Sequence, residues 1–409
     1  MAVFTRTMDL LLSVPEAPER PIEARSAEAR SAGTVRQLVD RYRWMAPTAV
    51  VGMTSWFVGF LGLWAGSYIV KSSISGAALR WDSDWYYRIS QTGYPNRVAT
   101  SATDTEGLRT AFFPGLPIVE NLVHRVVGGS PDHTTFVVGF LALVVSCVIL
   151  RALVAFDFGE EVARRVVVMF AFFPGAYVFV LGYSEALAIP LAMFTLYALR
   201  RRWLVVAGLV AGLAATTRLL GAALVISCLV GAVRELRGDD VRRPGRVVAA
   251  VASPVLALWG IAAYLLYLKV HTGHAMAFET AERIGWNNTA SLLAPLSALR
   301  AFVDSPFTTP ADTVNALGVV ALCAGLFFLG VSRLRLEDKA FAAAILLVWL
   351  FTTNAGIGAW FRFVELAFPL VVATAVRIPS ARQPPLVAFF AGGLGILVVL
   401  FATVVAFSP

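Results

Sequence analysis

Two acids two residues apart stand in the densest aromatic and charged segment of the chain, residues 80–94, which read RWDSDWYYRISQTGY. If this segment is a helix, side chains two apart point about 200° away from each other, so Asp82 and Asp84 cannot face one cleft. Asp84 has Arg80 and Arg88 one turn away on either side, which predicts a solvated ion pair. Asp82 has no cation at the corresponding positions.

Asp82 therefore has two interpretations. It follows Trp81, and a carboxylate beside an aromatic ring at a bilayer boundary can act as a general base toward a hydroxyl. The alternative is that Asp82 is the N-cap of a helix. The D-x-D pattern also occurs at metal–nucleotide sites, but the topology below places this segment outside the cytoplasm, where nucleotide sugars are absent. The chain also has no Walker loop or glycine-rich dinucleotide motif.

Two arginines lie in or beside apolar runs. Arg218 is a lone guanidinium between two apolar stretches, where an unpaired charge is costly and usually functional. It is predicted to contact a phosphate, which its forked guanidinium suits, to pair with Glu185 or Glu365, or to snorkel to the interface. Arg362 is a second candidate for phosphate contact, and the spacing predicts that it pairs with Glu365 three residues on.

Two histidines, His271 and His274, follow a long apolar run. Their spacing would suit part of a metal site, but no third ligand is evident and Gly273 favours a turn. The alternative is that His271 lines an acceptor site or shuttles a proton. Farther along, Trp286 either stacks on a sugar or anchors the chain at the membrane interface. Ser184, next to Glu185, is either part of the substrate site or a helix cap.

The elements that carry these residues are predicted to be membrane helices. The 409 residues are 58% hydrophobic and 15% charged, with a mean hydropathy of +0.73, whereas soluble domains carry about 25% charged residues. Apolar runs that could cross a bilayer occupy about 47–69, 134–156, 165–181, 185–199, 203–217, 219–233, 247–269, 312–332, 339–353, 361–377 and 386–407. The predicted fold class is an all-α polytopic bundle of about eleven transmembrane helices. The two runs that flank Thr217-Arg218 are either two spans or a broken, re-entrant pair.

Cation positions predict the orientation of this bundle. With the N-terminus in the cytoplasm, 23 of the 34 Lys and Arg residues fall on the cytoplasmic side, as the positive-inside rule requires. Residues 1–44 are predicted to be a disordered cytoplasmic tail, and residues 45–409 form the membrane domain. The long outer loops are about 70–133 and 270–311, with interfacial helices in the first. The net charge of +8 is a topology signal, with anionic inner-leaflet lipid as its partner, and indicates no nucleic acid.

Five blocks along the chain then show a resemblance. They are Trp81-Asp82 with Ile89 and Gly93-Tyr94, Ala111–Pro117 (AFFPGLP), Leu181–Leu187 (LGYSEAL), Thr217–Gly221 (TRLLG), and Arg362-Phe363 with Phe368-Pro369. Over about residues 45–400, and in this order, they resemble the PIG-V-type mannosyltransferases, the family of the second mannosyltransferase of GPI-anchor synthesis and its bacterial relatives.

The resemblance implies a bacterial plasma-membrane glycosyltransferase of the GT-C type. Such an enzyme transfers mannose, with inversion, from a polyprenyl-phosphate-mannose donor to a lipid-linked or glycan acceptor on the extracytoplasmic side. The family's catalytic carboxylate maps onto Asp82. No cofactor and no metal are expected. The residues predicted to contact the substrates are Arg218, Glu185, Tyr183, Arg362, Trp81, Asp84 and His271.

Two other functions stay open at this stage. A transporter or flippase of lipid-linked sugars would need no transfer chemistry, but transporters show internal repeats and charges near the membrane midplane. Here the distinctive residues gather toward one face, which favours an enzyme. A scaffold subunit that has kept the fold and lost activity is the third hypothesis, against which the presence of Asp82 argues.

Overall fold

The computed structural model describes residues 43–128, 130–238, 243–286, 293, 296, 300, 303–304, 310–352 and 360–404. The chain divides into two compact units, residues 1–47 and 48–409, and the first is described only from residue 43 on. Three segments thus lie largely outside the described residues: the predicted tail, the second predicted outer loop after residue 286, and the connection between the predicted spans 339–353 and 361–377. Within the described part, the second unit contains helices and no strand.

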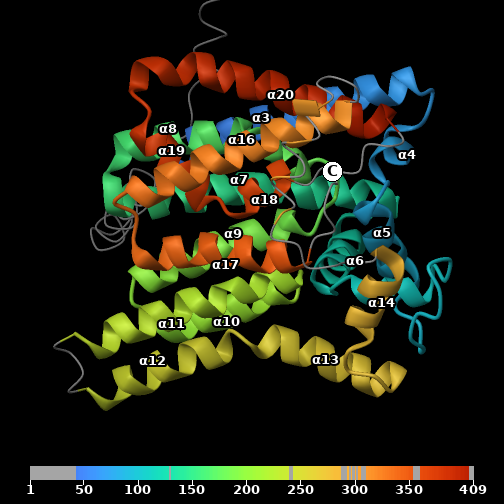
Figure 1. Ribbon diagram of the computed structural model, residues 1–409, viewed down its shortest axis with the longest axis horizontal. Coiled ribbons are helices and arrows are strands. Elements are labelled where there is room, and N and C mark those ends of the chain that lie inside the picture. Colours follow the sequence, from blue (N-terminus) through green and yellow to red (C-terminus); the bar gives the residue numbers. More distant parts are fainter. Residues whose placement is uncertain are drawn as a thin grey trace, which may run out of the picture. The chain divides into compact units, whose positions relative to one another are not determined.

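The helices that cross this unit run in broadly one direction, from one side of Figure 1 toward the other. They are α3 (Met45–Ile69), α7 (Pro131–Phe158), α8 (Glu160–Phe172), α9 (Glu185–Arg200), α10 (Leu204–Ala215), α11 (Ala223–Leu236), α12 (Pro244–Leu256), α13 (Trp259–Thr272), α16 (Pro310–Val331), α17 (Leu336–Thr352), α19 (Pro369–Arg377) and α20 (Gln383–Thr403). Among the described residues, α3, α7, α16 and α20 are each long and apolar enough to cross a membrane, and the pair α12 and α13 adds a fifth span if counted as one.

Apolar side chains lie both inside and outside this bundle. Phe170, Phe179 and Leu143 are fully buried in its core, whereas Phe57 and Phe389 are exposed on its outside. A helix that is hydrophobic on every face is stable only in the core of a protein or in a membrane. The outer apolar faces therefore suit contact with lipid.

Three of the predicted spans are interrupted, two of them directly before a proline. Predicted span 165–181 ends its α-helix at Phe172 and continues as the 3-10 helix η2 (Pro174–Phe179); 361–377 divides into α18 (Trp360–Leu366) and α19, which begins at Pro369. Span 247–269 bends by 42° between α12 and α13, with Pro254 in the last turn of α12. Proline lacks an amide hydrogen and clashes with the preceding turn, which accounts for the breaks before Pro174 and Pro369.

The pair around Arg218 is short. Helix α10 has 12 residues and α11 has 14, with the 3-10 helix η3 (Leu219–Ala222) between them. At 1.5 Å per residue α10 is about 18 Å long, well below the thickness of a hydrocarbon core of about 30 Å. The predicted interruption at Thr217-Arg218 is thus present, and it brings a polar segment into an apolar bundle.

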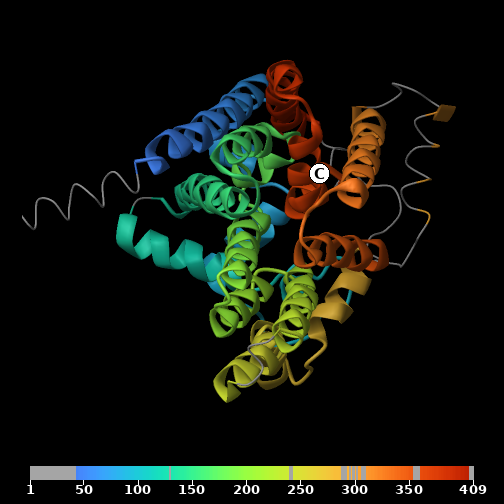
Figure 2. The same cartoon turned by 90° about the vertical axis from the view of Figure 1, so that its left-hand side faces the viewer.

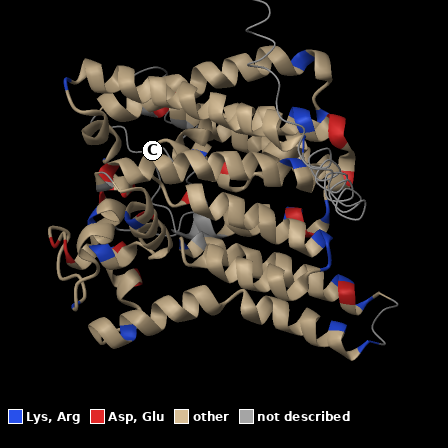
Figure 3. Ribbon diagram, turned by 180° about the vertical axis from the view of Figure 1, so that it is seen from behind, with Lys and Arg blue, Asp and Glu red and all other residues tan. Residues whose placement is uncertain are grey.

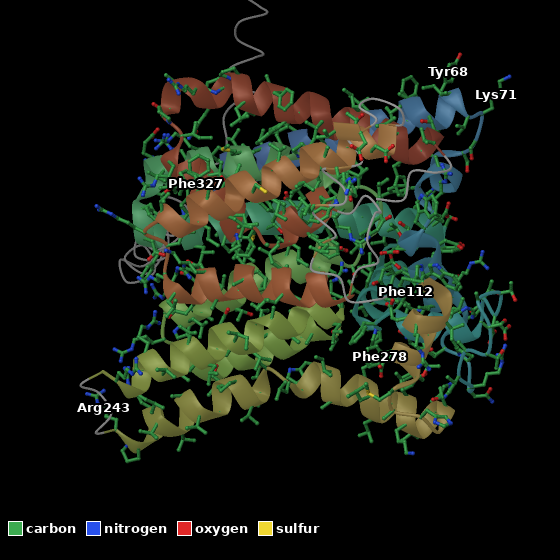
Figure 4. The ribbon with its side chains drawn as sticks, viewed as in Figure 1. Tyr68, Lys71, Phe112, Arg243, Phe278 and Phe327 are labelled. Carbon is green, nitrogen blue, oxygen red and sulfur yellow. The ribbon has the colours of Figure 1, made fainter. Side chains whose placement is uncertain are left out.

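Arginines and acids form a network at one end of the long helices, seen in colour in Figure 3 and marked by Arg243 in Figure 4. Arg200 pairs with Asp157 at 2.8 Å and with Asp338 at 2.5 Å, and Arg335 also pairs with Asp157 at 2.8 Å. These residues belong to, or adjoin, the segments predicted to face the cytoplasm. Their gathering at a single end agrees with the predicted alternation of loops.

A layer of short helices covers the opposite end, on the right in Figure 1. It consists of α4 (Ile74–Ala78), α5 (Asp82–Thr92), the 3-10 helix η1 (Gly107–Ala111), α6 (Gly115–Val127) and α14 (Ala277–Trp286). Helix α6 runs across the long helices: Figure 1 looks along its axis and Figure 2 shows it lengthwise. Its exposed residues Ile118, Leu122 and Val126 follow a helical spacing of four. An apolar stripe on a helix lying across the bundle is typical of an interfacial helix.

The two outer loops form one layer. Helix α14 from the second loop packs against η1 from the first, and Figure 4 shows Phe112 and Phe278 in this region. The ring centroids of Trp85, Phe112 and Trp286 are 5.4–5.7 Å apart. Trp286 therefore joins the two loops through aromatic packing, a role that its position in the sequence did not indicate. This packing holds the layer over the ends of the long helices.

Candidate active site

Helix α5 presents the two acids of the first outer loop. It begins at Asp82, and Trp81 occupies the N-cap position with φ 56° and ψ −130°. The alternative prediction that Asp82 is the N-cap is therefore wrong, because Asp82 is the first residue of the helix. A tryptophan with this backbone is strained by about 1–3 kcal/mol, and such strain concentrates at functional sites.

Asp82 and Asp84 point to different partners, as the helical spacing predicts. Asp84 Oδ2 lies 2.7 Å from Arg88 Nε, and both side chains are largely open to solvent. Asp82 Oδ2 lies 2.9 Å from Arg362 Nη2, and the Arg362 side chain is only 9% exposed. The predicted solvated pair of Asp84 with Arg88 is confirmed. Asp82 is the acid that faces the interior of the protein.

Arg362 links Asp82 to a second acid. Its Nε pairs with Glu185 Oε1 at the start of α9, and its guanidinium carbon lies 4.7 Å from the centroid of the Tyr183 ring. The predicted pair of Arg362 with Glu365 is wrong. Glu365 is fully buried, and neither of its carboxyl oxygens has a hydrogen-bond partner among the described residues. Arg362 makes its contacts toward α5 and α9, whereas Glu365 packs beside Gly175 of η2.

Arg218 completes the group. Its Nη1 pairs with Glu185 Oε1, and its guanidinium carbon lies 5.8 Å from the centroid of Phe363. Of the predicted alternatives for Arg218, the structure contains the ion pair with Glu185; a snorkelling side chain is wrong, because only 12% of it is exposed. Asp82, Glu185, Arg218 and Arg362 are called the charge cluster below.

Two negative and two positive side chains make the charge cluster neutral overall. Glu185 has no exposed surface and lies between both guanidinium groups. Buried charges are stable only when they are paired and hydrogen-bonded. Asp82 is the more accessible acid, with 28% of its side chain exposed. The arrangement therefore offers one reachable carboxylate, backed by two arginines whose positions depend on Glu185.

Residues of the block Leu181–Leu187 pack beneath the charge cluster. Tyr183 is fully buried beneath Arg362. Ser184 occupies the N-cap position of α9 but makes no capping hydrogen bond, so the prediction of a cap is wrong. Instead the Tyr86 hydroxyl donates to Ser184 Oγ at 2.9 Å. Gly182 has φ +69°, and a Cβ there would collide with Thr135, which accounts for glycine before Tyr183.

A second glycine fixes the segment that carries Arg218. The Gly115 amide, at the start of α6, donates to the Thr216 carbonyl at 2.8 Å. A Cβ at Gly115 would lie 2.8–2.9 Å from atoms of Thr216 and Thr217. The sequence blocks AFFPGLP and TRLLG are thus in direct contact. Their close approach holds the residues just before Arg218 against the outer layer.

An apolar cavity of about 1160 Å³ lies between α5, α6, α7, α9, α10 and α13, and none of the four residues of the charge cluster is part of its wall. Its wall includes Thr217, next to Arg218 in sequence, and Leu187, two residues after Glu185. Nearly all of its lining is hydrophobic, and among the described residues its wall contains one cation, Arg125, and no acid. Cavities of this size hold organic ligands. This one suits a long hydrocarbon chain.

His271 and Trp81, both predicted to contact the substrates, lie outside the charge cluster, and their predicted contact stays a prediction. The His271 ring stacks on Tyr267 with centroids 5.1 Å apart, and its Nε2 lies 3.3 Å from the Tyr94 carbonyl oxygen. These contacts are at the edge of the cavity, and no contact between His271 and the charge cluster is present in the described part of the chain. Trp81 packs against the core with its ring and adjoins Asp82 through the backbone. Among the described residues, no group of three or more His, Cys, Asp or Glu side chains could hold a metal ion.

Glu120 is an acid in the outer layer that sequence reasoning missed. It lies on α6, 4% exposed, and its Oε1 accepts a hydrogen bond of 2.7 Å from Thr135 Oγ1. Burial raises the pKa of Glu120 to about 7. Glu120 is two residues away from both Ile118 and Leu122, which are exposed, so the helical period places it on the opposite face of α6. The sequence alone does not show that this face is buried, because that requires knowing that α6 packs on α7.

The pKa of Glu120 predicts a pH dependence of stability. In the folded state Glu120 keeps its proton up to about pH 7, whereas in an unfolded chain it loses the proton near pH 4.5. Stability is therefore fully present below pH 4.5 and falls as the pH rises to 7, by up to about 3 kcal/mol. Thermal unfolding from pH 5 to 8 should show wild type losing stability relative to Glu120→Gln. Parallel curves would contradict this, and Glu106→Gln, at an exposed acid of the same loop, is the control.

Comparison with known proteins bears on the fold. No protein-family model matches the chain, and no curated protein sequence matches it. Among solved structures it is similar to ArnT from Cupriavidus metallidurans bound to undecaprenyl phosphate, with a TM-score of 0.52 and 14% identity over 88% of this chain. The helices of this chain are thus arranged like those of ArnT. The predicted all-α membrane bundle is therefore confirmed, but the predicted number of about eleven transmembrane helices is not.

A second solved structure matches less well. It is the Archaeoglobus fulgidus oligosaccharyltransferase tethered with an acceptor peptide, with a TM-score of 0.42 and 12% identity over 91% of this chain. The chain spans less than two thirds of the length of either structure, 63% of ArnT and 56% of the oligosaccharyltransferase. At these identities the likeness concerns the path of the backbone.

Proposed function

We propose that this chain is a PIG-V-type membrane mannosyltransferase that uses a polyprenyl-phosphate-mannose donor and a lipid-linked or glycan acceptor. One observation carries the proposal: a large apolar cavity has Thr217 in its wall, and the next residue, Arg218, belongs to a charge cluster with two arginines and an accessible carboxylate. A polyprenyl-phosphate sugar has the matching chemistry, since it combines a long hydrocarbon chain, an anionic phosphate and a sugar. The ArnT structure named above contains undecaprenyl phosphate, which is the same class of lipid.

The donor would place its chain in the cavity and its phosphate near Arg218. Thr216 and Thr217 belong to the cavity wall, so Arg218 follows directly where the wall ends. Arginine binds phosphate through its forked donors. Arg362 stands on the other side of Glu185 and would neutralise part of the same charge. The phosphate would thus replace some of the pairing that Glu185 now supplies to both guanidinium groups.

Asp82 would act as the general base. Its carboxylate takes the proton of the acceptor hydroxyl while the acceptor oxygen bonds to the anomeric carbon of the donor sugar. The bond between that carbon and the phosphate oxygen breaks, and the phosphate leaves with the electron pair. Attack opposite to the leaving phosphate inverts the anomeric centre. The two arginines stabilise the charge that develops on the phosphate, so the scheme needs no metal and no cofactor.

The proposed location follows from the same scheme. The charge cluster lies toward the end of the bundle covered by α5 and α6, opposite to the network of Arg200 and Asp157. With the N-terminus in the cytoplasm of a bacterium, as the cation distribution predicts, this end faces outward. Transfer would take place at the outer leaflet of the plasma membrane.

Replacement of Arg218 by Gln tests the donor assignment. Loss of a charge-assisted contact to phosphate is worth about 1.5–3 kcal/mol, so the KM for labelled polyprenyl-phosphate mannose should rise about 10–100-fold. Transfer is measured in membranes that contain the full-length chain, with Arg164→Gln, at an exposed ion pair, as the control. An unchanged donor KM would remove the phosphate role of Arg218. Movement of the intact donor across vesicles without transfer by wild type would point to a flippase instead.

A further inference from the structure

The segment that carries Asp82 is attached to the last helix of the chain. The Arg80 guanidinium donates from Nη1 to the carbonyl oxygens of Phe401 at 3.0 Å and Ala402 at 2.7 Å. Helix α20 ends at Thr403, so both carbonyls belong to its last turn. Carbonyls in the last turn lack intrahelical donors and carry partial negative charge. Arg80 therefore supplies both the hydrogen bonds and the positive charge that this helix end requires.

A second attachment lies on the other side of Asp82. Ser83 is buried, and its hydroxyl donates to the Leu181 carbonyl oxygen, two residues before Tyr183. The residues on either side of Asp82 in sequence are thus Trp81, with its strained backbone, and Ser83, bound to the third sequence block. Arg80 precedes the strained residue directly. Strained backbone persists only where the surroundings hold it.

We infer that Arg80 is a positioning residue, and that it holds the Trp81 backbone in its strained form so that Asp82 faces Arg362. The expected effect of Arg80 on catalysis rests on the proposed function. Its expected effect on the backbone rests on the observed contacts alone. The outward end of α20 thereby becomes part of the support of the active site. Neither Arg80 nor α20 contacts the substrates in the proposed scheme.

Two alternative attachments can be compared with Arg80. Arg362 also touches Asp82, but through the side-chain carboxylate, so it does not fix the backbone at Trp81. Arg88 pairs with Asp84 on the solvent side of α5 and leaves the start of the helix free. Arg80 is positioned to act on the backbone before Asp82, because it joins residue 80 to another helix.

Replacing Arg80 by Ala tests the inference in two independent ways. Hydrogen–deuterium exchange of the purified full-length protein in lipid nanodiscs should become faster in residues 80–92 and in the last turn of α20. Transfer from polyprenyl-phosphate mannose should lose about 10–100-fold in kcat with an unchanged donor KM, because a displacement of about 1 Å at a catalytic group can cost 100-fold. Arg80→Lys, which keeps the charge, should recover part of both effects, and Arg88→Ala should show neither.

The outcomes separate this inference from the proposed function. The positioning role would be overturned if hydrogen–deuterium exchange in residues 80–92 were unchanged in Arg80→Ala. It would also be overturned if the variant raised the donor KM and left kcat unchanged. If wild type transfers no sugar from a polyprenyl phosphate, the proposed function fails, and the exchange measurement alone decides whether Arg80 holds the segment. Equal exchange in Arg80→Lys and Arg80→Ala would mean that the charge at the end of α20 has no part in it.

Discussion

Replacement of Asp82 by Asn is expected to lower the rate of sugar transfer by about 10²–10⁴-fold, the usual contribution of a general base. Asparagine keeps the shape of the side chain and can still accept a hydrogen bond from Arg362, which lies 2.9 Å from Asp82 Oδ2. It cannot take the proton of an acceptor hydroxyl. The fall should therefore appear in kcat, with the donor KM little changed. Initial rates at several donor concentrations measure both quantities.

Asp84 provides the matched control on the same helix. It is two residues away and pairs with Arg88 in solvent, so Asp84→Asn should retain most of the activity. Normal transfer by a well-folded Asp82→Asn protein would refute the base assignment. Equal losses in both variants would mean that helix α5, and not one carboxylate, is what the reaction requires.

Local spacing predicted that the two acids face different sides of the helix and have different partners. The period of a helix alone places Asp82 and Asp84 on different sides, and the pair of Asp84 with Arg88 follows from a separation of four residues. The same local rule failed at Arg362, which leaves Glu365 and pairs with Asp82 and Glu185. A local ion pair is worth only about 0.2–0.5 kcal/mol. Arg362 instead pairs with Glu185 and Asp82, which come from distant parts of the chain, and this choice cannot be predicted from local spacing.

Most contacts between distant segments could not be predicted from the sequence, although the pair of Arg218 with Glu185 was among the predicted alternatives. Apolar runs predicted the helices, and prolines gave a local signal for two of the three breaks. Neither feature indicates that Gly115 binds the Thr216 carbonyl or that Arg80 reaches Ala402. The cavity could not be predicted either, because it is the space left between six helices. The resemblance to a family named several residues of the charge cluster without predicting how they pair.

Removal of Glu185 is expected to have the largest effect on stability. Glu185 is fully buried and pairs with both Arg218 and Arg362. Glu185→Leu would leave Arg218 without its partner, while Arg362 would keep Asp82. Breaking a buried ion pair from one side costs about 3–5 kcal/mol, because the remaining charge is desolvated and uncompensated. The midpoint of thermal unfolding in detergent should fall accordingly, and transfer should be lost.

A double variant distinguishes this electrostatic cause from poor packing. Adding Arg218→Leu to Glu185→Leu removes the uncompensated charge, so it should recover part of the lost stability, although transfer stays absent because the phosphate contact is gone. Such recovery is the interaction energy that a double-mutant cycle isolates. Glu161→Leu is the control, since the pair of Glu161 with Arg164 is exposed and exposed pairs contribute little. Further destabilisation by Arg218→Leu would contradict the argument, because it would mean that Arg218 stabilises the fold through contacts other than Glu185.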